Sequence, residues 1–335
     1  MSPPACRACG SPDVALRGRK PGRFLRRDFE FFTCRACSFL FVEPFSGFEI
    51  YDDAYYRGHG PDPYVDYESE YRDWRRSDRR LEFDDLFRLA AERLGTHAKP
   101  VAPIPSGIST SLPTSSASAG ARSPAPSLSP PLPLRWLDFG CGAGAFLKYL
   151  RERGSLLGRP LELTGHDVGS YARLLATADG FRILDPTQLA REPDASCDLI
   201  SMVEVIEHLP QPLEPLRLAA RLLKPGGLLL LTTGNLDSPV ARRQGIHYRY
   251  CAPEIHVSLF NPRCLATLYR QAGLEPCQVR YHGAVQFKVL KTLRHRPALR
   301  PLARFGLRLP PVVRLVDFLY GVSAMPCALK PPPPA

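Results

Sequence analysis

The sequence predicts an α/β protein whose main domain is a parallel sheet covered by helices on both faces. Three observations lead to this class. Strand-like and helix-like patterns alternate from residue 134 to about residue 290, as in βαβ units. A glycine-rich turn follows the first strand of this block. Paired cysteines set the first 45 residues apart as a small separate unit.

The glycine-rich turn has a strand before it and a helix after it. The apolar run 134–139 ends in Gly140, Gly142 and Gly144, and the amphipathic segment 145–153 follows at once. Glycine permits positive φ and lets a ligand approach the main chain, while the helix N-terminus favours an anionic group. The spacing differs from the dinucleotide fingerprint, and no P-loop lysine follows. The turn therefore predicts a nucleotide-like ligand that carries a carboxylate or a phosphate.

Acidic residues stand beside this turn and at the ends of the next strands. Further strands are expected at 161–167, 181–185, 197–205 and 228–233, with a helix at 213–223. Asp167 lies where an acid accepts ribose hydroxyls in a doubly wound sheet, although it could instead cap the helix near Ser170. Asp138 is expected to orient the loop or to reach the cofactor through water. Asp185 is expected near the adenine, or it simply forms a turn with Pro186.

These features occur in an order that resembles the class I S-adenosylmethionine (SAM) methyltransferases. The resemblance rests on the loop from Asp138 to Gly144, the acid at 167, and the segments 202–209 (Met-Val-Glu-Val-Ile-Glu-His-Leu) and 222–228 (Leu-Leu-Lys-Pro-Gly-Gly-Leu). It implies a Rossmann-like, doubly wound, seven-stranded sheet and SAM as cofactor. It also implies that Met202 and Glu204 approach the cofactor. Glu207 and His208 are either a structural hydrogen-bonded pair or catalytic groups.

The N-terminal cysteines have the spacing of a metal site. Cys6-x-x-Cys9 and Cys34-x-x-Cys37 supply two thiol pairs, which match a structural, tetrahedral Zn²⁺ site with ligands at about 2.3 Å. A redox Cys-x-x-Cys would more often be single and lie in a βαβ unit. A subset of SAM methyltransferases carries such a zinc ribbon before a tyrosine-rich stretch. The segment 254–260 also resembles that subset, whereas Gly234-Asn235 departs from it.

The same reasoning divides the chain into five parts. They are a zinc ribbon (1–45), a Tyr- and Arg-rich helical connector (46–98), a disordered Pro/Ser/Ala linker (99–133), a SAM-binding methyltransferase domain (134–290) and a basic C-terminal extension (291–335). Within the connector, the spacing of apolar residues predicts a helix over 71–94.

The net charge and the hydropathy of the chain indicate which partners and which location to expect. The formal net charge is +11, with arginine clusters at 17–27, 72–80 and 280–308. Such clusters bind nucleic acids or anionic surfaces, or they reflect an arginine-rich composition. The N-terminus has no apolar signal region, and no uncharged apolar run approaches ~18 residues. We therefore expect a cytoplasmic protein without a transmembrane segment.

The acceptor is predicted mainly by exclusion. The segment after the fourth strand lacks both the Asn/Asp-Pro-Pro-aromatic turn of base-amine methylation and a Pro-Cys nucleophile. The resemblance places His256 on the acceptor side, as a general base or as a structural histidine. We expect O- or C-methylation of a small molecule or glycan. Nucleic acid is possible but not favoured. The alternatives are an RNA or protein methyltransferase that uses the ribbon and residues 17–27, or a non-catalytic zinc- and SAM-binding scaffold.

Overall fold

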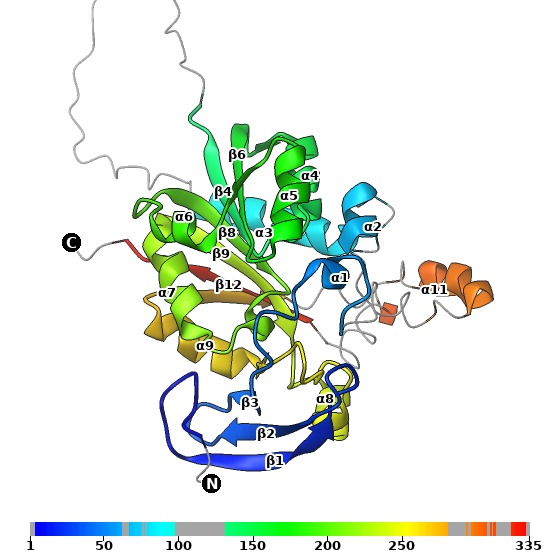
Figure 1. Ribbon diagram of the computed structural model, residues 1–335. Helices are drawn as coiled ribbons and strands as arrows, with labels where there is room; N and C mark the ends of the chain where they lie inside the picture. Colours follow the sequence, from blue (N-terminus) through cyan, green and yellow to red (C-terminus); the bar gives the residue numbers. More distant parts are fainter. Residues whose placement is uncertain are drawn as a thin grey trace, which may run out of the picture.

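The computed structural model describes residues 4–61, 67–97 except 76 and 78, 131–280, 296–306 and 323–332, together with 293, 309, 311 and 312 (Figure 1). Of the linker expected at 99–133, only residues 131–133 are described. Two sheets organise this part of the chain.

The larger sheet has the strand order β11-β12-β9-β8-β4-β6, and β7 and the short β5 both pair with β6. Its strands are β4 (Leu134–Phe139), β5 (Ser155–Leu156), β6 (Arg159–His166), β7 (Arg182–Leu184), β8 (Cys197–Val203), β9 (Leu223–Gly234), β11 (Glu275–Arg280) and β12 (Ser323–Leu329). The neighbours from β7 to β9 run parallel to one another. The expected α/β class is confirmed. Seven strands form the doubly wound sheet, and β5 adds a two-residue strand at its edge.

Strand β12 comes from a part of the chain that the sequence assigns to an extension. It lies antiparallel between β9 and β11, within the range 291–335. The sheet therefore uses residues beyond 290, and the boundary predicted there leaves out one of its central strands. Nothing in the local sequence of a seven-residue strand specifies which distant strands it joins.

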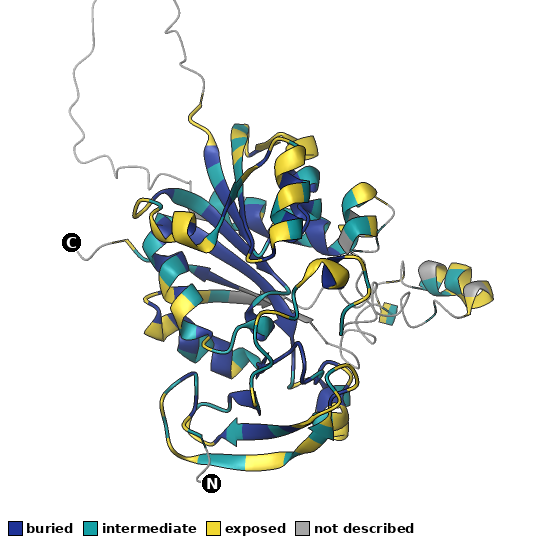
Figure 2. Cartoon of the chain, in the orientation of Figure 1, coloured by how far each residue is buried: buried dark blue, intermediate teal, exposed yellow. Residues whose placement is uncertain are grey.

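Helices cover both faces of this sheet because its strands bury side chains on both sides (Figure 2). Leu228 and Leu230 of β9 pack in one cluster with helices α3 and α4, whereas Leu229 and Leu231 pack in the other with α7 and α9. The described helices of four or more residues are α1 (Asp53–Tyr56), α2 (Tyr67–Arg72), α3 (Arg80–His97), α4 (Ala145–Arg153), α5 (Ser170–Ala178), α6 (Pro186–Ala190), α7 (Leu213–Leu222), α8 (Pro239–Gln244), α9 (Pro262–Gln271) and α11 (Arg300–Gly306).

The connector and the start of β9 differ from the sequence prediction. The helix expected over 71–94 is divided into α2 and α3. Strand β9 begins at Leu223 and includes the Lys-Pro-Gly-Gly segment that we expected only to end a helix. Within the described ranges, no helix combines the length and the apolar character needed to cross a bilayer.

The smaller, antiparallel sheet joins the N-terminal unit to the main domain. Its order is β1 (Val14–Pro21), β2 (Asp28–Cys34), β3 (Leu40–Glu43) and β10 (Ser258–Leu259). Strand β10 belongs to the main domain, so the N-terminal sheet is completed by a segment from far along the chain (Figure 1). The rings of Phe39 and Phe260 lie 5.4 Å apart across this junction.

Candidate functional site

An open cavity lies at the carboxyl ends of β4, β6 and β8, where doubly wound sheets bind their ligands. About 880 Å³ of atom-free space, part of it open to solvent, lies between its walls. Its walls come from the glycine loop, from the ends of β6 and β8, and from aromatic residues of the connector. The polar side chains among the lining residues are Tyr51, Tyr55, Tyr56, Arg79, Asp138, Cys141, His166, Asp167, Glu204 and His208.

The glycine loop is held against the end of β6. The amides of Gly140 and Cys141 donate to the carbonyl of His166 at 2.7 and 2.9 Å. Gly140 has φ +74°, and a Cβ there would lie 2.5 Å from Cγ2 of Val205. Any other residue here would strain the backbone through its positive φ, and its side chain would clash with Val205. Gly140 and Gly142 line the cavity, and their contact with a cofactor stays a prediction.

Gly144 serves the packing of helices. It has φ +90° at the N-terminus of α4, and a Cβ would lie 3.2 Å from the Cβ of Ala176 in α5. It is not among the residues that line the cavity. The third glycine therefore allows α4 and α5 to approach each other beside the site.

Asp167 is buried at the edge of the cavity and holds the loop together. One carboxylate oxygen accepts the amide of Gly142 at 2.8 Å, and the other accepts the amide of Gly169 and the hydroxyl of Tyr56, each also at 2.8 Å. The position agrees with a ribose contact. The hydroxyl of Tyr56 and the two amides use three of the roughly four acceptor positions of this carboxylate, which leaves one for a ribose hydroxyl.

Asp138 is buried behind the loop and also lines the cavity. Its carboxylate accepts the hydroxyl of Ser201 at 2.6 Å. Burial raises its pKa to about 7, against the opposing effects of the Ser201 hydrogen bond and of Arg79. The group therefore changes charge near neutral pH.

The end of β8 presents Val203 and Glu204 to the cavity, whereas Met202 faces the opposite side. Met202 is fully buried in the core below the sheet and does not reach the cavity, because side chains alternate along a strand. Glu204 has φ +54°, a conformation that is uncommon outside glycine. One of its carboxylate oxygens, Oε1, is buried and has no hydrogen-bond partner among the described residues.

Asp185 lies outside the cavity, and its side chain caps a helix. Its carboxylate accepts the amide of Gln188 at 2.8 Å and caps α6. The side chain of Gln188 returns to the amide of Asp185 at 2.9 Å, which completes a capping box. The sequence allows either an adenine contact or a turn with Pro186 at this position. The structure gives Asp185 a backbone role, as the residue that caps α6 immediately before Pro186.

His208, and not His256, is the histidine of this region that lines the cavity. His208 Nδ1 lies 2.9 Å from the carbonyl of Ile255, and His256 Nδ1 lies 2.7 Å from the carbonyl of Tyr250. A carbonyl only accepts, so Nδ1 carries the proton in each neutral ring and Nε2 carries the lone pair. The two rings are 5.0 Å apart, so His256 forms a second layer behind His208.

Glu207 is fully buried beside these rings. It accepts hydrogen bonds from the hydroxyls of Thr233, at 2.9 Å, and Tyr250. Burial and the neighbouring charge of Glu204 raise its pKa well above the usual value. No hydrogen bond joins Glu207 to His208 in the described part of the chain, so they are not the hydrogen-bonded pair that the sequence suggested.

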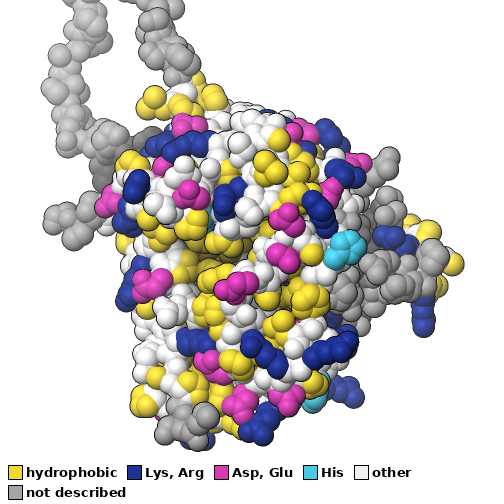
Figure 3. All heavy atoms as spheres, viewed as in Figure 1, with side chains coloured by type: hydrophobic (Ala, Val, Ile, Leu, Met, Phe, Trp, Pro, Cys, Tyr) yellow, Lys and Arg dark blue, Asp and Glu magenta, His cyan; other side chains and the backbone are white. Residues whose placement is uncertain are grey.

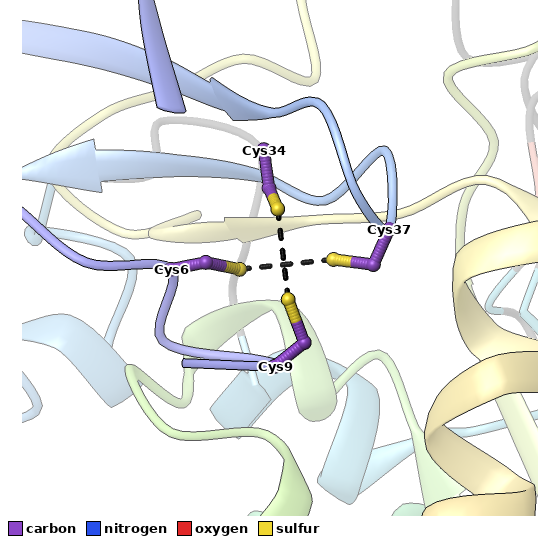
Figure 4. A group of neighbouring side chains, drawn as sticks. All are labelled: Cys6, Cys9, Cys34 and Cys37. Carbon is purple, nitrogen blue, oxygen red and sulfur yellow. Dashed lines mark hydrogen bonds between the residues drawn. The ribbon is translucent and has the colours of Figure 1, made fainter. Parts of the chain in front are cut away.

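The four N-terminal cysteines point toward one another (Figure 4). The Sγ atoms of Cys6 and Cys37 are 3.7 Å apart, and those of Cys9 and Cys34 are 3.6 Å apart. These distances exclude disulfides, whose S–S bond is about 2.05 Å. A tetrahedral ion with ligands at about 2.3 Å places its sulfurs about 3.75 Å apart. The donors and their separation fit Zn²⁺.

The sequence did not identify the residues that close the cavity. Phe48, Tyr51, Tyr55 and Tyr56 reach it from the connector, and Arg79 and Phe83 reach it from the start of α3. The only signal in the sequence was the density of tyrosines between 51 and 71. Figure 3 shows hydrophobic side chains gathered at the centre of one face of the molecule, with Lys/Arg and Asp/Glu side chains interspersed around them.

Together, the doubly wound sheet and the cavity at its carboxyl edge define an α/β protein built to bind a nucleotide-like cofactor. A family model described as "Methyltransferase domain" matches residues 106–279, about half of the chain. The chain belongs to this methyltransferase-domain family, which confirms the resemblance drawn from the glycine loop.

Curated relatives match a shorter stretch. The chain is 29% identical over 160 residues to a ubiquinone biosynthesis O-methyltransferase of Bordetella pertussis, covering 44% of this chain and 64% of that protein. It is 34% identical over 107 residues to one of Pseudomonas aeruginosa, covering 30% and 44%. The matched part thus spans less than two thirds of these relatives.

Solved structures are more distant. A phosphoethanolamine N-methyltransferase of Haemonchus contortus in complex with SAM is 17% identical with a TM-score of 0.43, covering 60% of this chain and 49% of that one. A SAM-dependent methyltransferase of Archaeoglobus fulgidus is 18% identical with a TM-score of 0.41, covering 59% and 86%.

Proposed function

We propose that this protein transfers a methyl group from SAM to an oxygen atom of a small molecule, a sugar included. The observation that carries the proposal is the cavity in which the glycine loop, Asp138 and Asp167 converge, within a chain of the methyltransferase-domain family. The curated relatives, whose names describe O-methyltransferases, favour oxygen over carbon as the acceptor atom.

The residues of the cavity suit the parts of this cofactor. SAM supplies a methyl group that its sulfonium already activates, so the protein must align the acceptor and exclude water. The loop and the N-terminus of α4 would bind the carboxylate of SAM, and Asp167 would bind the ribose. Asp138, when ionised, would attract the positive charge of the cofactor. The tyrosines of the connector would cover it.

The acceptor would bind between the connector and His208. In the neutral ring, Nε2 of His208 carries the lone pair that can accept the proton of an acceptor hydroxyl. His256 would orient this region from the second layer. It remains a candidate for catalysis through His208 rather than by direct contact with the acceptor.

We also propose that the four cysteines hold a structural Zn²⁺ ion. The Sγ separations of 3.6–3.7 Å support a tetrahedral thiolate site, and such a site stabilises a domain too small for a large core. A cytoplasmic location, where thiols remain reduced, is part of this proposal.

Calorimetry with SAM, followed by transfer of a labelled methyl group to a panel of hydroxylated metabolites, tests the function. We expect the protein to bind SAM and Asp167→Ala to weaken binding by about 100-fold, while the exposed control Asp194→Ala binds normally. His208→Ala and His256→Ala should retain SAM binding and lose turnover. Absence of SAM binding by the unmodified protein would refute the proposal.

The competing polymer function has its own signature. If the ribbon held RNA through residues 17–27, RNA binding should be tight and should weaken steeply as salt rises. If SAM binds but no acceptor is methylated, the scaffold function is favoured. These outcomes separate the three alternatives.

A further inference from the structure

Two acidic side chains meet at the rear of the cavity, the fully buried Glu207 and the partly buried Glu204. The hydroxyl of Tyr250 contacts both of them, since it donates to Glu207 and lies 3.3 Å from Oε2 of Glu204. One hydroxyl carries a single proton, so it cannot satisfy both groups when both are ionised. Oε1 of Glu204 is buried without a hydrogen-bond partner in the described ranges. Within those ranges, the ion pairs of Lys and Arg involve neither glutamate.

Two histidines, His208 and His256, lie close to Glu207. One ligand atom each from Glu207, His208 and His256 lie within 4.8 Å of one another. Ligands on opposite sides of an ion, with bonds of about 2.1 Å, lie about 4.2 Å apart, so a small closure would bring all three onto one ion.

The histidines are also oriented as metal ligands usually are. Each Nδ1 donates to a backbone carbonyl, of Ile255 and of Tyr250, and this fixes the ring and leaves the lone pair on Nε2. Such bonds from the non-ligating nitrogen are the common support of metal-binding histidines. Thr233 supports Glu207 in the same way, because its hydroxyl donates to Oε2.

From this arrangement, we propose that Glu207, His208 and His256 bind a divalent metal ion at the rear of the cavity, with Glu204 beside it to balance the charge. Two imidazole nitrogens and carboxylate oxygens suit a six-coordinate first-row ion such as Mn²⁺ or Fe²⁺. Three protein ligands leave positions open on such an ion. Because His208 lines the cavity, an open position would face the space proposed for the acceptor.

The metal site rests on the proposed function, because it assumes that a small-molecule acceptor binds in this cavity. It adds to that function a group that can bind the acceptor oxygen. A cation binds the lone pair of an oxygen and lowers the pKa of a bound hydroxyl, as it does for water. Its position therefore favours an oxygen acceptor over a carbon acceptor. With the ion bound, Nε2 of His208 is a metal ligand and no longer a proton acceptor, and the bound hydroxyl gives up its proton to water. His256, which the sequence predicts as a general base, becomes the second histidine ligand.

Titration with Mn²⁺ alone, followed by electron paramagnetic resonance, tests the site without measuring turnover. The full chain is first loaded with one equivalent of Zn²⁺, which prefers the four thiolates. We expect one Mn²⁺ to bind per chain. Glu207→Gln and His256→Ala should weaken binding by about 100-fold or more, and Thr233→Val by about 10-fold, because outer-shell partners account for 10–100-fold in metal affinity.

Matched controls keep the outcomes distinct. His247→Ala removes an exposed histidine and should bind Mn²⁺ as the unmodified protein does. His208→Asn alters a cavity-lining ligand with little change in buried volume, so it tests the site even if Glu207→Gln fails to fold. Absence of Mn²⁺ binding by the unmodified protein would overturn the metal site. The same holds if His208→Asn and His256→Ala both bind Mn²⁺ as tightly as the unmodified protein. SAM binding in the same samples reports separately on the proposed function.

Discussion

At the scale of single residues, the burial of Asp138 makes the stability of the fold depend on pH. Its carboxyl is 2% exposed, and burial raises its pKa from 3.8 to about 7. Since the folded-state pKa lies above the unfolded one, protonation stabilises the fold. This stabilisation is complete below pH 3.8 and is lost as the pH rises through about 7.

The charge of Asp138 should make cofactor binding depend on pH. Because SAM carries a positive sulfonium, it should bind the ionised form, so affinity should rise about eightfold between pH 6.0 and 7.5. Asp138→Asn should remove this dependence in calorimetric titrations, while the exposed Asp194→Asn retains it. Asp138→Asn should also raise the free energy of unfolding at pH 8 by about 1–3 kcal/mol, since it abolishes the buried charge. A flat profile for the unmodified protein would contradict this account.

Gly140 offers a second test at this scale, with a matched control in the same chain. Gly140 and Gly226 have almost the same φ, +74° and +77°, but only a Cβ at Gly140 would meet a neighbour, Val205. Alanine at either site should cost about 1 kcal/mol of strain. The clash should raise the cost of Gly140→Ala to about 2–4 kcal/mol and impair SAM binding. Equal unfolding free energies for the two variants would show that Val205 moves away freely.

At the scale of elements, the N-terminal sheet positions the segment that carries His256. Strand β10 pairs with β3, and the carboxylate of Glu254 accepts the amides of Arg23 and Phe24, at 3.1 and 2.8 Å, as well as that of Leu25. The ribbon therefore contacts the chain on both sides of His256, at Glu254 and at β10. This arrangement differs from a separate module that only holds a polymer.

Loosening the ribbon should therefore disturb the acceptor side of the cavity more than the cofactor side. Glu254→Gln replaces one acceptor oxygen with a donor and should cost about 1–3 kcal/mol of stability. Turnover should fall, and SAM affinity should change less than twofold. If the four cysteines hold Zn²⁺ as proposed, its removal should lower stability and turnover further than Glu254→Gln does. The control is Glu214→Gln on the exposed face of α7, which should change neither quantity.

Local patterns predicted the elements that depend on local sequence. The turn at 140–144, the acid at 167 and the paired cysteines were identified because each is a short motif with its own geometry. The pairing of β10 with β3, the insertion of β12 and the approach of Tyr56 to Asp167 were missed, because each joins residues far apart in the chain. His256 was chosen over His208 for the same reason, since only the fold decides which ring faces the cavity.

At the scale of the whole molecule, the connector belongs to the core of the main domain. Phe83, Leu86 and Leu89 of α3 are buried in one cluster with Trp136 of β4 and Leu230 of β9. Burial of such side chains contributes about 1.5–3 kcal/mol each. The part of the chain before the predicted linker is therefore bound to the part after it by packing, and β3–β10 pairing adds a second junction.

Cleavage within the predicted linker should consequently leave the molecule assembled. Elastase, which cuts after small residues, should cleave between residues 99 and 130, where Ser, Ala, Pro and Gly predominate. The two fragments should co-elute in size-exclusion chromatography and bind SAM with the affinity of the intact chain. Phe83→Ala together with Leu86→Ala should allow them to separate after cleavage, because about 5–10 kcal/mol of packing is lost. Separation of the unsubstituted fragments would mean that the linker, and not the shared core, holds the two parts together.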